Sequence, residues 1–326
     1  MKRSPFLLVT LLGCASGQST VVAEDALAPG LRAGPHEVQL NGARHFYRVG
    51  GVASSGAPPV VFLHGGPGQG SEHFDALVGS FMEPRLRMVY FDQRGSGHSE
   101  RPASGDYALG TLVDDVEALR RELGVPKIAV VGHSFGGLLA LEYAAKYPAS
   151  VSHVVFVAGL WDTRRQCQLR VERLAQLRPD AYARVRGDTI APDGTRRSDC
   201  DLEFLALRGA EREKYNSEAM FPDRDIERKM DSVNAARGVR NTGELGRALF
   251  SAGLLTYRFQ RFDRLTMPVL VIAGKLDGAA QPRGLRELAE TLPNARFVEF
   301  DRSGHFVYLD EPERFAREVS DFILGR

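Results

Sequence analysis

Apolar and polar residues alternate near the start of the folded chain and then give way to short, uninterrupted apolar runs. Between Val38 and Val49 the alternation has a period of two, and Asn41-Gly42 interrupts it. Two alternating segments joined by Asn-Gly are typical of an antiparallel hairpin. We therefore predict that the fold opens with a hairpin.

Apolar runs follow the hairpin, and segments with helical periodicity separate several of them. In residues 111–123, for example, apolar residues recur on one side of a helix. Strands that alternate with helices form a parallel sheet covered on both faces. We predict an α/β fold with a mostly parallel central sheet flanked by helices. The predicted strands are residues 59–63, 88–91, 127–131, 154–157, 268–273 and 295–300.

One long block interrupts this alternation. From Trp161 to about Phe262 the chain is rich in Arg, Glu, Leu and Ala and has no clear strand pattern. Helical segments inserted between two strands of a sheet are typical of a lid. We therefore predict a core formed by residues 30–160 and 266–326, with a helical cap at 161–265.

Residues 1–23 differ in kind from the rest of the chain. A basic start, Met1-Lys2-Arg3, precedes an apolar run at 6–12 that is too short to span a bilayer as a helix. This arrangement is typical of a secretory signal followed by a tether. Leu11-Leu12-Gly13-Cys14 also resembles the lipobox of bacterial lipoproteins, in which the cysteine is acylated; cleavage after Ala23 is the alternative. We expect an exported protein, periplasmic or membrane-anchored, that contacts the membrane only through a lipid on Cys14.

Charge and cysteine content argue against nucleic-acid binding and against a zinc site, and they leave a disulfide possible. Lys and Arg number 42 and Asp and Glu 41, so the chain lacks the basic excess of a nucleic-acid-binding protein. Only Cys167 and Cys200 remain beyond the signal, without the Cys-x-x-Cys spacing of a zinc site. An exported compartment permits a disulfide between them, and two thiols are the alternative.

A serine on a sharp turn is the first sign of chemistry. Gly132-His133-Ser134-Phe135-Gly136 follows the run at 127–131 and precedes an apolar helix. In this G-x-S-x-G context the serine hydroxyl is exposed, and the glycines let strand and helix approach closely. The helix N-terminus favours the negative charge that develops in acyl transfer. We predict that Ser134 is a nucleophile.

A serine hydroxyl needs a base, and the base needs an orienting acid. Where this turn carries the nucleophile, the acid and then the histidine follow it in the chain. Only His153 and His305 come after Ser134, and His153 precedes any suitable acid. His305 is therefore the predicted base. Asp277, which closely follows the run at 268–273, is the predicted acid, with Asp162 as the alternative.

The negative charge on the attacked oxygen requires two backbone N–H donors. One is expected from Phe135, the residue after the nucleophile, and the other from the loop after the first buried strand. That loop is residues 64–68, His-Gly-Gly-Pro-Gly, and Gly66 is the candidate donor. His64 and His133 are expected to orient loops rather than to act as bases.

These residues together resemble the α/β-hydrolase superfamily. The motifs at 64–68 and Phe91-Asp92-Gln93-Arg94-Gly95-Ser96-Gly97-His98-Ser99 look like those of the prolyl aminopeptidase (proline iminopeptidase) family, over residues 36–159 and 266–326. The resemblance implies the α/β-hydrolase fold, the triad and the oxyanion hole named above. It also implies cleavage of N-terminal residues, often proline, from short peptides without metal or organic cofactor. The turn that carries Ser134 departs from this family, whose members usually have Gly-Gly-Ser-Trp-Gly there. This chain has Gly-His-Ser-Phe-Gly, a form that is common in esterases and lactonases.

The leading hypothesis is accordingly an aminopeptidase that acts on small peptides. A carboxylic ester or lactone hydrolase is the alternative, and an inactive hydrolase fold that serves in binding is a remote one. An aminopeptidase must recognise an α-ammonium, whose charge needs a carboxylate partner in a closed cleft. The core motifs supply none, so we look to the cap, where Glu203 lies in an apolar segment and is the predicted partner.

Overall fold

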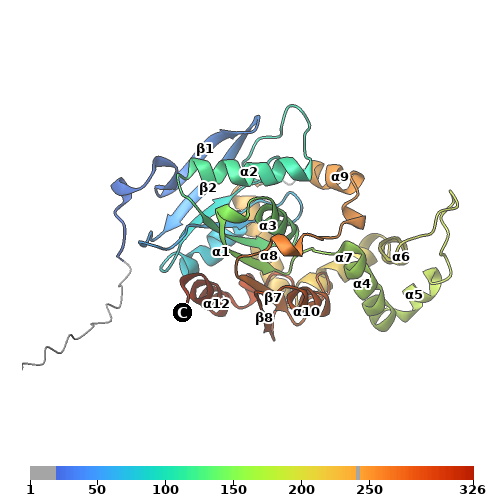
Figure 1. The fold of residues 1–326 in the computed structure, drawn as a ribbon. Coiled ribbons are helices and arrows are strands. Elements are labelled where there is room, and N and C mark those ends of the chain that lie inside the picture. Colours follow the sequence, from blue (N-terminus) through green and yellow to red (C-terminus); the bar gives the residue numbers. More distant parts are fainter. Residues whose placement is uncertain (1–19, 240–242) are drawn as a thin grey trace, which may run out of the picture.

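The computed structural model describes residues 20–239 and 243–326, in which helices surround one eight-stranded sheet (Figure 1). The strand order is β1-β2-β4-β3-β5-β6-β7-β8; β2 pairs antiparallel with β1 and with β4, and every other pair is parallel. The predicted mostly parallel α/β sheet is therefore confirmed. The strands are β1 Gly34–Leu40, β2 Ala43–Gly51, β3 Val60–Leu63, β4 Arg87–Phe91, β5 Ile128–His133, β6 Val151–Val157, β7 Val269–Gly274 and β8 Ala295–Phe300.

The opening hairpin is formed by β1 and β2, and its turn explains the Asn-Gly pair. Asn41 and Gly42 both have positive φ values, 44° and 82°. Positive φ at both central residues defines the turn that matches the twist of a two-residue hairpin. Leu40 pairs with Ala43 directly beside it, as the sequence pattern predicts.

The central strands are mostly apolar because helices cover both of their faces. Every residue of β3, β4, β5 and β7 is buried. Side chains of α2, α3 and α10 form one apolar layer with the sheet, and those of α1, α11 and α12 form the other. These helices are α1 Glu72–Met82, α2 Leu109–Glu122, α3 Phe135–Lys146, α10 Pro282–Thr291, α11 Val307–Asp310 and α12 Pro312–Leu324.

The inserted block between β6 and β7 is helical. It contains α4 Thr163–Leu177, α5 Pro179–Val185, α6 Asp199–Ala206, α7 Gly209–Met220, α8 Arg224–Ala236 and α9 Glu244–Ser251. In Figure 1, α5 and α6 lie at the end of the molecule away from the sheet. By contrast, α9 contacts the segment before α2, because the Tyr107 hydroxyl donates a hydrogen bond to Glu244. Buried side chains on α4 to α7 form a small apolar cluster of their own, separate from the two layers of the core.

The parallel strands determine where chemistry can occur. β5, β6, β7 and β8 are neighbours that run in the same direction, so the loops after their carboxyl ends meet at one edge of the sheet. In open α/β sheets, ligands bind in the crevice outside these carboxyl ends. Ser134, Asp277 and His305 all lie in loops or turns that follow these strands.

Candidate active site

Ser134 occupies a strained turn between β5 and α3. Its backbone has φ 54° and ψ −118°, a conformation that costs a non-glycine residue about 1–3 kcal/mol. No side chain would fit at Gly136, since a Cβ there would lie 2.0 Å from the Leu63 carbonyl oxygen. Close packing of α3 against β3 thus fixes the turn and leaves Ser134 partly exposed.

The structure places the side chains of His305 and Asp277 within hydrogen-bond distance of each other. His305 Nδ1 lies 2.9 Å from Asp277 Oδ2, and both residues are buried. Asp277 Oδ1 also accepts hydrogen bonds from the backbone N–H groups of Ala279 and Ala280, at 2.8 Å each. Because Nδ1 of the imidazole donates to the carboxylate, Nε2 remains available to accept a proton from a serine hydroxyl.

The alternative acid and the alternative histidine have other partners. Asp162 caps α4 by accepting a hydrogen bond from the Arg165 N–H at 2.9 Å, and it forms an ion pair with Arg258. The ring of His153, on β6, packs edge-on against Phe322. The structure therefore pairs Asp277, and not Asp162, with His305.

The loop of the predicted oxyanion hole runs beside the predicted nucleophile. A Cβ on Gly65 would lie 2.9 Å from Ser134 Cβ, so the glycine loop runs directly beside the serine. Gly66 is exposed with φ 118°, and its N–H has no hydrogen-bond partner among residues 20–239 and 243–326. Phe135 begins α3, where the first N–H groups of a helix have no partner within it. Two backbone donors thus border the turn that carries Ser134.

A buried histidine supports the glycine loop. His64 Nδ1 donates to the Gly65 carbonyl at 3.0 Å, and His64 Nε2 accepts from the Gln93 backbone N–H at 3.1 Å. The Gln93 side chain donates to the His64 carbonyl at 2.8 Å. Burial lowers the pKa of His64, which keeps the ring neutral with one donor and one acceptor nitrogen. His64 thus orients a loop, in line with the sequence prediction.

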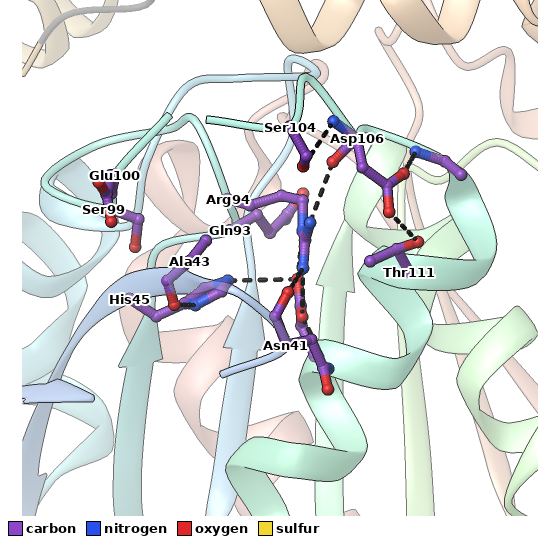
Figure 2. Close-up of polar contacts among 12 residues, drawn as sticks. Asn41, Ala43, His45, Gln93, Arg94, Ser99, Glu100, Ser104, Asp106 and Thr111 are labelled. Carbon is purple, nitrogen blue, oxygen red and sulfur yellow. Dashed lines mark hydrogen bonds and ion pairs between the residues drawn. The ribbon is translucent and has the colours of Figure 1, made fainter. Parts of the chain in front are cut away.

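The Asp92–Ser99 motif serves as a scaffold (Figure 2). Arg94 donates to both carboxylate oxygens of Asp115 on α2, at 2.6 and 2.7 Å, and to the backbone carbonyls of Asn41 and Asp106. Burial raises the pKa of Asp115, but hydrogen bonds from His45 and Arg94 outweigh it and lower the pKa. Sequence reasoning missed Asp115, because it is simply a polar position in a helical pattern. Its only signal is an arginine motif that needs a buried partner.

The cap does not present Glu203 as an isolated carboxylate. Glu203 Oε2 lies 2.9 Å from Arg170 Nε on α4. Burial raises the pKa of Glu203, while the charges of Arg170 and Arg173 act in the opposite direction. Its helix, α6, packs on α4 and α5 and lies towards the outer end of the cap (Figure 1). The predicted role of Glu203 in binding the substrate amine therefore stays a prediction, and its carboxylate already has a partner in Arg170.

The two cap cysteines are bonded in the structure. The sulfur atoms of Cys167 on α4 and Cys200 on α6 are 2.01 Å apart, and the disulfide spans 33 positions of the chain. It joins the two cap helices that also carry the Arg170–Glu203 ion pair. Cys14 lies outside the described residues. No helix within 20–239 or 243–326 is long and apolar enough to cross a membrane.

Sequence reasoning also missed a contact between the cap and the triad loops. The carbonyl oxygens of Ala219 and Met220, at the end of α7, accept hydrogen bonds from the N–H groups of Gly278 and His305, at 2.7 and 2.9 Å. Gly278 follows the predicted acid, Asp277, and His305 is the predicted base. The last carbonyls of a helix lack partners within it, so they are free to accept these bonds. No sequence pattern signals a contact made by backbone atoms.

Comparison with known proteins agrees with this geometry. Residues 58–312 match the family model described as the alpha/beta hydrolase fold. The chain is 28% identical over 299 residues to a proline iminopeptidase of Lactiplantibacillus plantarum, covering 88% of this chain and 99% of that protein. It is 26% identical over 285 residues to one from Pestalotiopsis fici, covering 86% and 96%. A crystal structure of a proline iminopeptidase-related protein from Thermus thermophilus matches with a TM-score of 0.71 at 24% identity, covering 90% and 98%.

Proposed function

The chain belongs to the alpha/beta hydrolase fold family, and on this basis we propose that it is an aminopeptidase that releases N-terminal residues, proline among them, from small peptides. One observation carries the proposal. The strained Ser134, the bonded pair His305–Asp277 and the glycine loop at 64–68 meet at one sheet edge. The names of relatives that align over most of this chain support the peptide substrate.

The reaction follows from the assigned groups. His305 removes the proton from Ser134 as the serine oxygen attacks the substrate carbonyl. The N–H groups of Gly66 and Phe135 stabilise the resulting oxyanion. His305 then protonates the leaving amine, which leaves an acyl-enzyme on Ser134. Water, activated by the same histidine, releases the N-terminal residue as a free acid.

A panel of substrates tests the proposal. We expect aminoacyl-arylamides with a free amine, the prolyl one included, to be hydrolysed with a higher kcat/KM than their N-acetylated counterparts. Each pair shares its acyl group and leaving group, so the ratio reports recognition of the ammonium alone. A preference for the N-blocked member of every pair would contradict an aminopeptidase.

An ester or lactone hydrolase is the second candidate, and the pairing of Glu203 with Arg170 favours it. A carboxylate neutralised by an arginine is a poor partner for a substrate ammonium, whereas a neutral ester needs no such partner. Glu203→Gln separates the candidates. If Glu203 binds the substrate amine, replacing it should raise KM for aminoacyl substrates about tenfold. If it only pairs with Arg170, the KM values for esters and aminoacyl substrates change little and in parallel.

The third hypothesis, a binding protein without activity, is tested by a fluorophosphonate probe. Such a probe reacts with a serine that an adjacent base has activated. We expect covalent labelling of the wild-type protein at Ser134, located by peptide mass spectrometry. A wild-type protein that stays unlabelled would support the binding hypothesis.

We further propose that the protein is exported and acylated at Cys14. The disulfide between Cys167 and Cys200 supports export, since disulfides persist mainly in oxidising compartments. Intact-mass spectrometry of the protein from bacterial membranes should find an acylated cysteine at the mature N-terminus. An unmodified N-terminus at or beyond Ala15 would contradict acylation without affecting the proposed reaction.

A further inference from the structure

A chain of buried hydrogen bonds runs behind the triad and ends on the backbone of the base. His73 Nε2 on α1 lies 3.0 Å from the Tyr308 hydroxyl on α11, and that hydroxyl lies 3.3 Å from His133 Nδ1. His133 Nε2 lies 3.0 Å from the backbone carbonyl oxygen of His305. All four residues are buried. The mechanism above uses only the last of them.

The chemistry of these groups determines which atom donates and which accepts in each hydrogen bond of the chain. A carbonyl oxygen only accepts, so His133 Nε2 must carry a hydrogen. In a neutral ring Nδ1 is then an acceptor, which makes the Tyr308 hydroxyl the donor to it. Since the hydroxyl hydrogen is used, the Tyr308 oxygen must accept from His73 Nε2–H. The hydrogen-bond partners thus assign both histidine tautomers.

Burial keeps both rings neutral, as this direction requires. Burial is the largest cause that lowers the pKa of His73, to about 3, with the nearby His64 adding to it. Burial also holds the pKa of His133 well below its usual value, with His305 as the next cause. Aromatic rings surround the chain: Phe306 is 4.9 Å from the His133 ring and Phe74 is 4.8 Å from the Tyr308 ring, between centroids. A neutral His133 ring can therefore donate its Nε2–H to the His305 carbonyl.

The backbone of His305 is held from two sides as a result. Its N–H donates to the Met220 carbonyl of the cap, and its C=O accepts from His133 in the nucleophile turn. The imidazole then reaches Asp277 through Nδ1. A displacement of about 1 Å at a reacting group can cost about a hundredfold in rate, so the anchor of this backbone matters for proton transfer.

We propose that His133 is a positioning residue for the catalytic base: its Nε2–H holds the His305 carbonyl, and Tyr308 and His73 keep His133 in the tautomer that does so. The proposal rests on the triad of the proposed function but not on its substrate. A glycine at position 133, as in the motif of the prolyl aminopeptidase family, has no side chain that could hold the His305 carbonyl.

Three variants and one control test the proposal. His133→Leu removes the donor, His133→Gln offers an amide N–H in the place of Nε2–H, and Tyr308→Phe removes only the middle hydroxyl. His153→Leu is the matched control, because His153 lies on the neighbouring strand β6 outside the chain of hydrogen bonds. Each protein is assayed for its fluorophosphonate labelling rate, for kcat and KM on the best substrate of the panel, and for its thermal unfolding midpoint.

We expect His133→Leu to lower both the labelling rate and kcat at least about tenfold, with KM changed less than about twofold. His133→Gln should recover most of this loss, and Tyr308→Phe should lose less than His133→Leu. The double variant His133→Leu/Tyr308→Phe should be no slower than His133→Leu, since both act through one chain. The control should label at the wild-type rate.

Two results would overturn the proposal: equal rates for His133→Leu and wild type, or equal losses for His133→Gln and His133→Leu. If His133→Leu does not fold, Tyr308→Phe decides, because a wild-type labelling rate in it would show that the chain does not hold the base. Labelling involves no peptide. A wild-type enzyme that labels normally but hydrolyses no aminoacyl substrate would therefore count against the proposed substrate alone.

Discussion

The core edge that carries the triad and the outer cap lobe (α4–α6, residues 163–206) are stabilised by different interactions. At the core edge, charged groups are buried in pairs, as in Arg94–Asp115, where both side chains are at most 2% exposed. In the outer cap lobe the ion pairs differ in burial: Arg170–Glu203 is 29% and 15% exposed, whereas Arg184–Glu211, which joins the lobe to α7, is about half exposed on both sides. A few buried apolar side chains and one disulfide supply the rest.

This contrast indicates a division of labour. A buried, fully paired network has one low-energy arrangement, because leaving any member without a partner is costly. Exposed ion pairs contribute little and can exchange partners. The His305–Asp277 pair in the core is accordingly almost fully buried, whereas the outer cap lobe includes pairs that are about half exposed.

The largest expected effect is on the reaction itself. Ser134→Ala should lower kcat by about 10⁶-fold, and His305→Ala should be nearly as damaging because the two residues act as a unit. Hydrolysis of the best substrate and fluorophosphonate labelling both report this loss. The double variant Ser134→Ala/His305→Ala is the control, and it should be no slower than either single variant. More than about a hundredth of the wild-type activity in Ser134→Ala would refute the assignment.

The second effect tests the buried core network. Asp115→Ala leaves the Arg94 charge buried without a partner, so we expect a loss of about 3–5 kcal/mol in the free energy of unfolding. Arg165→Ala is the matched control in the outer cap lobe, where the partly exposed pair with Glu287 should contribute less than about 1 kcal/mol. Urea unfolding measures both. Similar losses for the two variants would remove the contrast between the regions.

The third effect tests the cap disulfide. Cys167→Ser/Cys200→Ser should lower the free energy of unfolding by about 3–4 kcal/mol, since the bond restricts a loop of 33 residues in the unfolded chain. The fluorophosphonate labelling rate of the folded protein should stay within about threefold of wild type. If wild-type protein unfolds at the same urea concentration with and without reductant, the disulfide contributes nothing to the free energy of unfolding.

The smallest effect concerns Asp310, which accepts a hydrogen bond from the Gly304 N–H beside the base, at 2.7 Å. Burial raises the pKa of Asp310 from 3.8 to about 6, and the Gly304 hydrogen bond opposes this rise. The folded state therefore holds this proton more tightly than the unfolded state. Its contribution to stability is complete below about pH 4 and is lost as the pH rises through about 6.

Asp310→Asn should remove that pH dependence. The difference in unfolding free energy between wild type and variant should change by on the order of 1 kcal/mol between pH 4 and 7, reduced from the full shift because the group is partly solvated. Glu313→Gln, at an exposed position of the neighbouring α12, should show no such change. A constant difference for Asp310→Asn across this range would contradict the raised pKa.

Several features of the fold and site follow from local patterns. The Asn41-Gly42 turn, the apolar strands and the glycine-flanked Ser134 each depend on a few adjacent residues, so the sequence signals them directly. The pairing of His305 with Asp277 is predictable because the expected chain order, nucleophile then acid then histidine, leaves few candidates after Ser134. Asp115 and the carbonyls of Ala219 and Met220 are not predictable, since their roles come from partners far along the chain.

Residue type, local motifs and chain order therefore predict the chemistry: a serine on a strand-to-helix turn, an acid and a base in order after it, and a glycine loop. The pairing of Glu203 with Arg170 and the hold of His133 on the His305 backbone emerge only once the chain is folded. Both depend on which polar groups are buried together, and a buried group must find its partner wherever the fold places one.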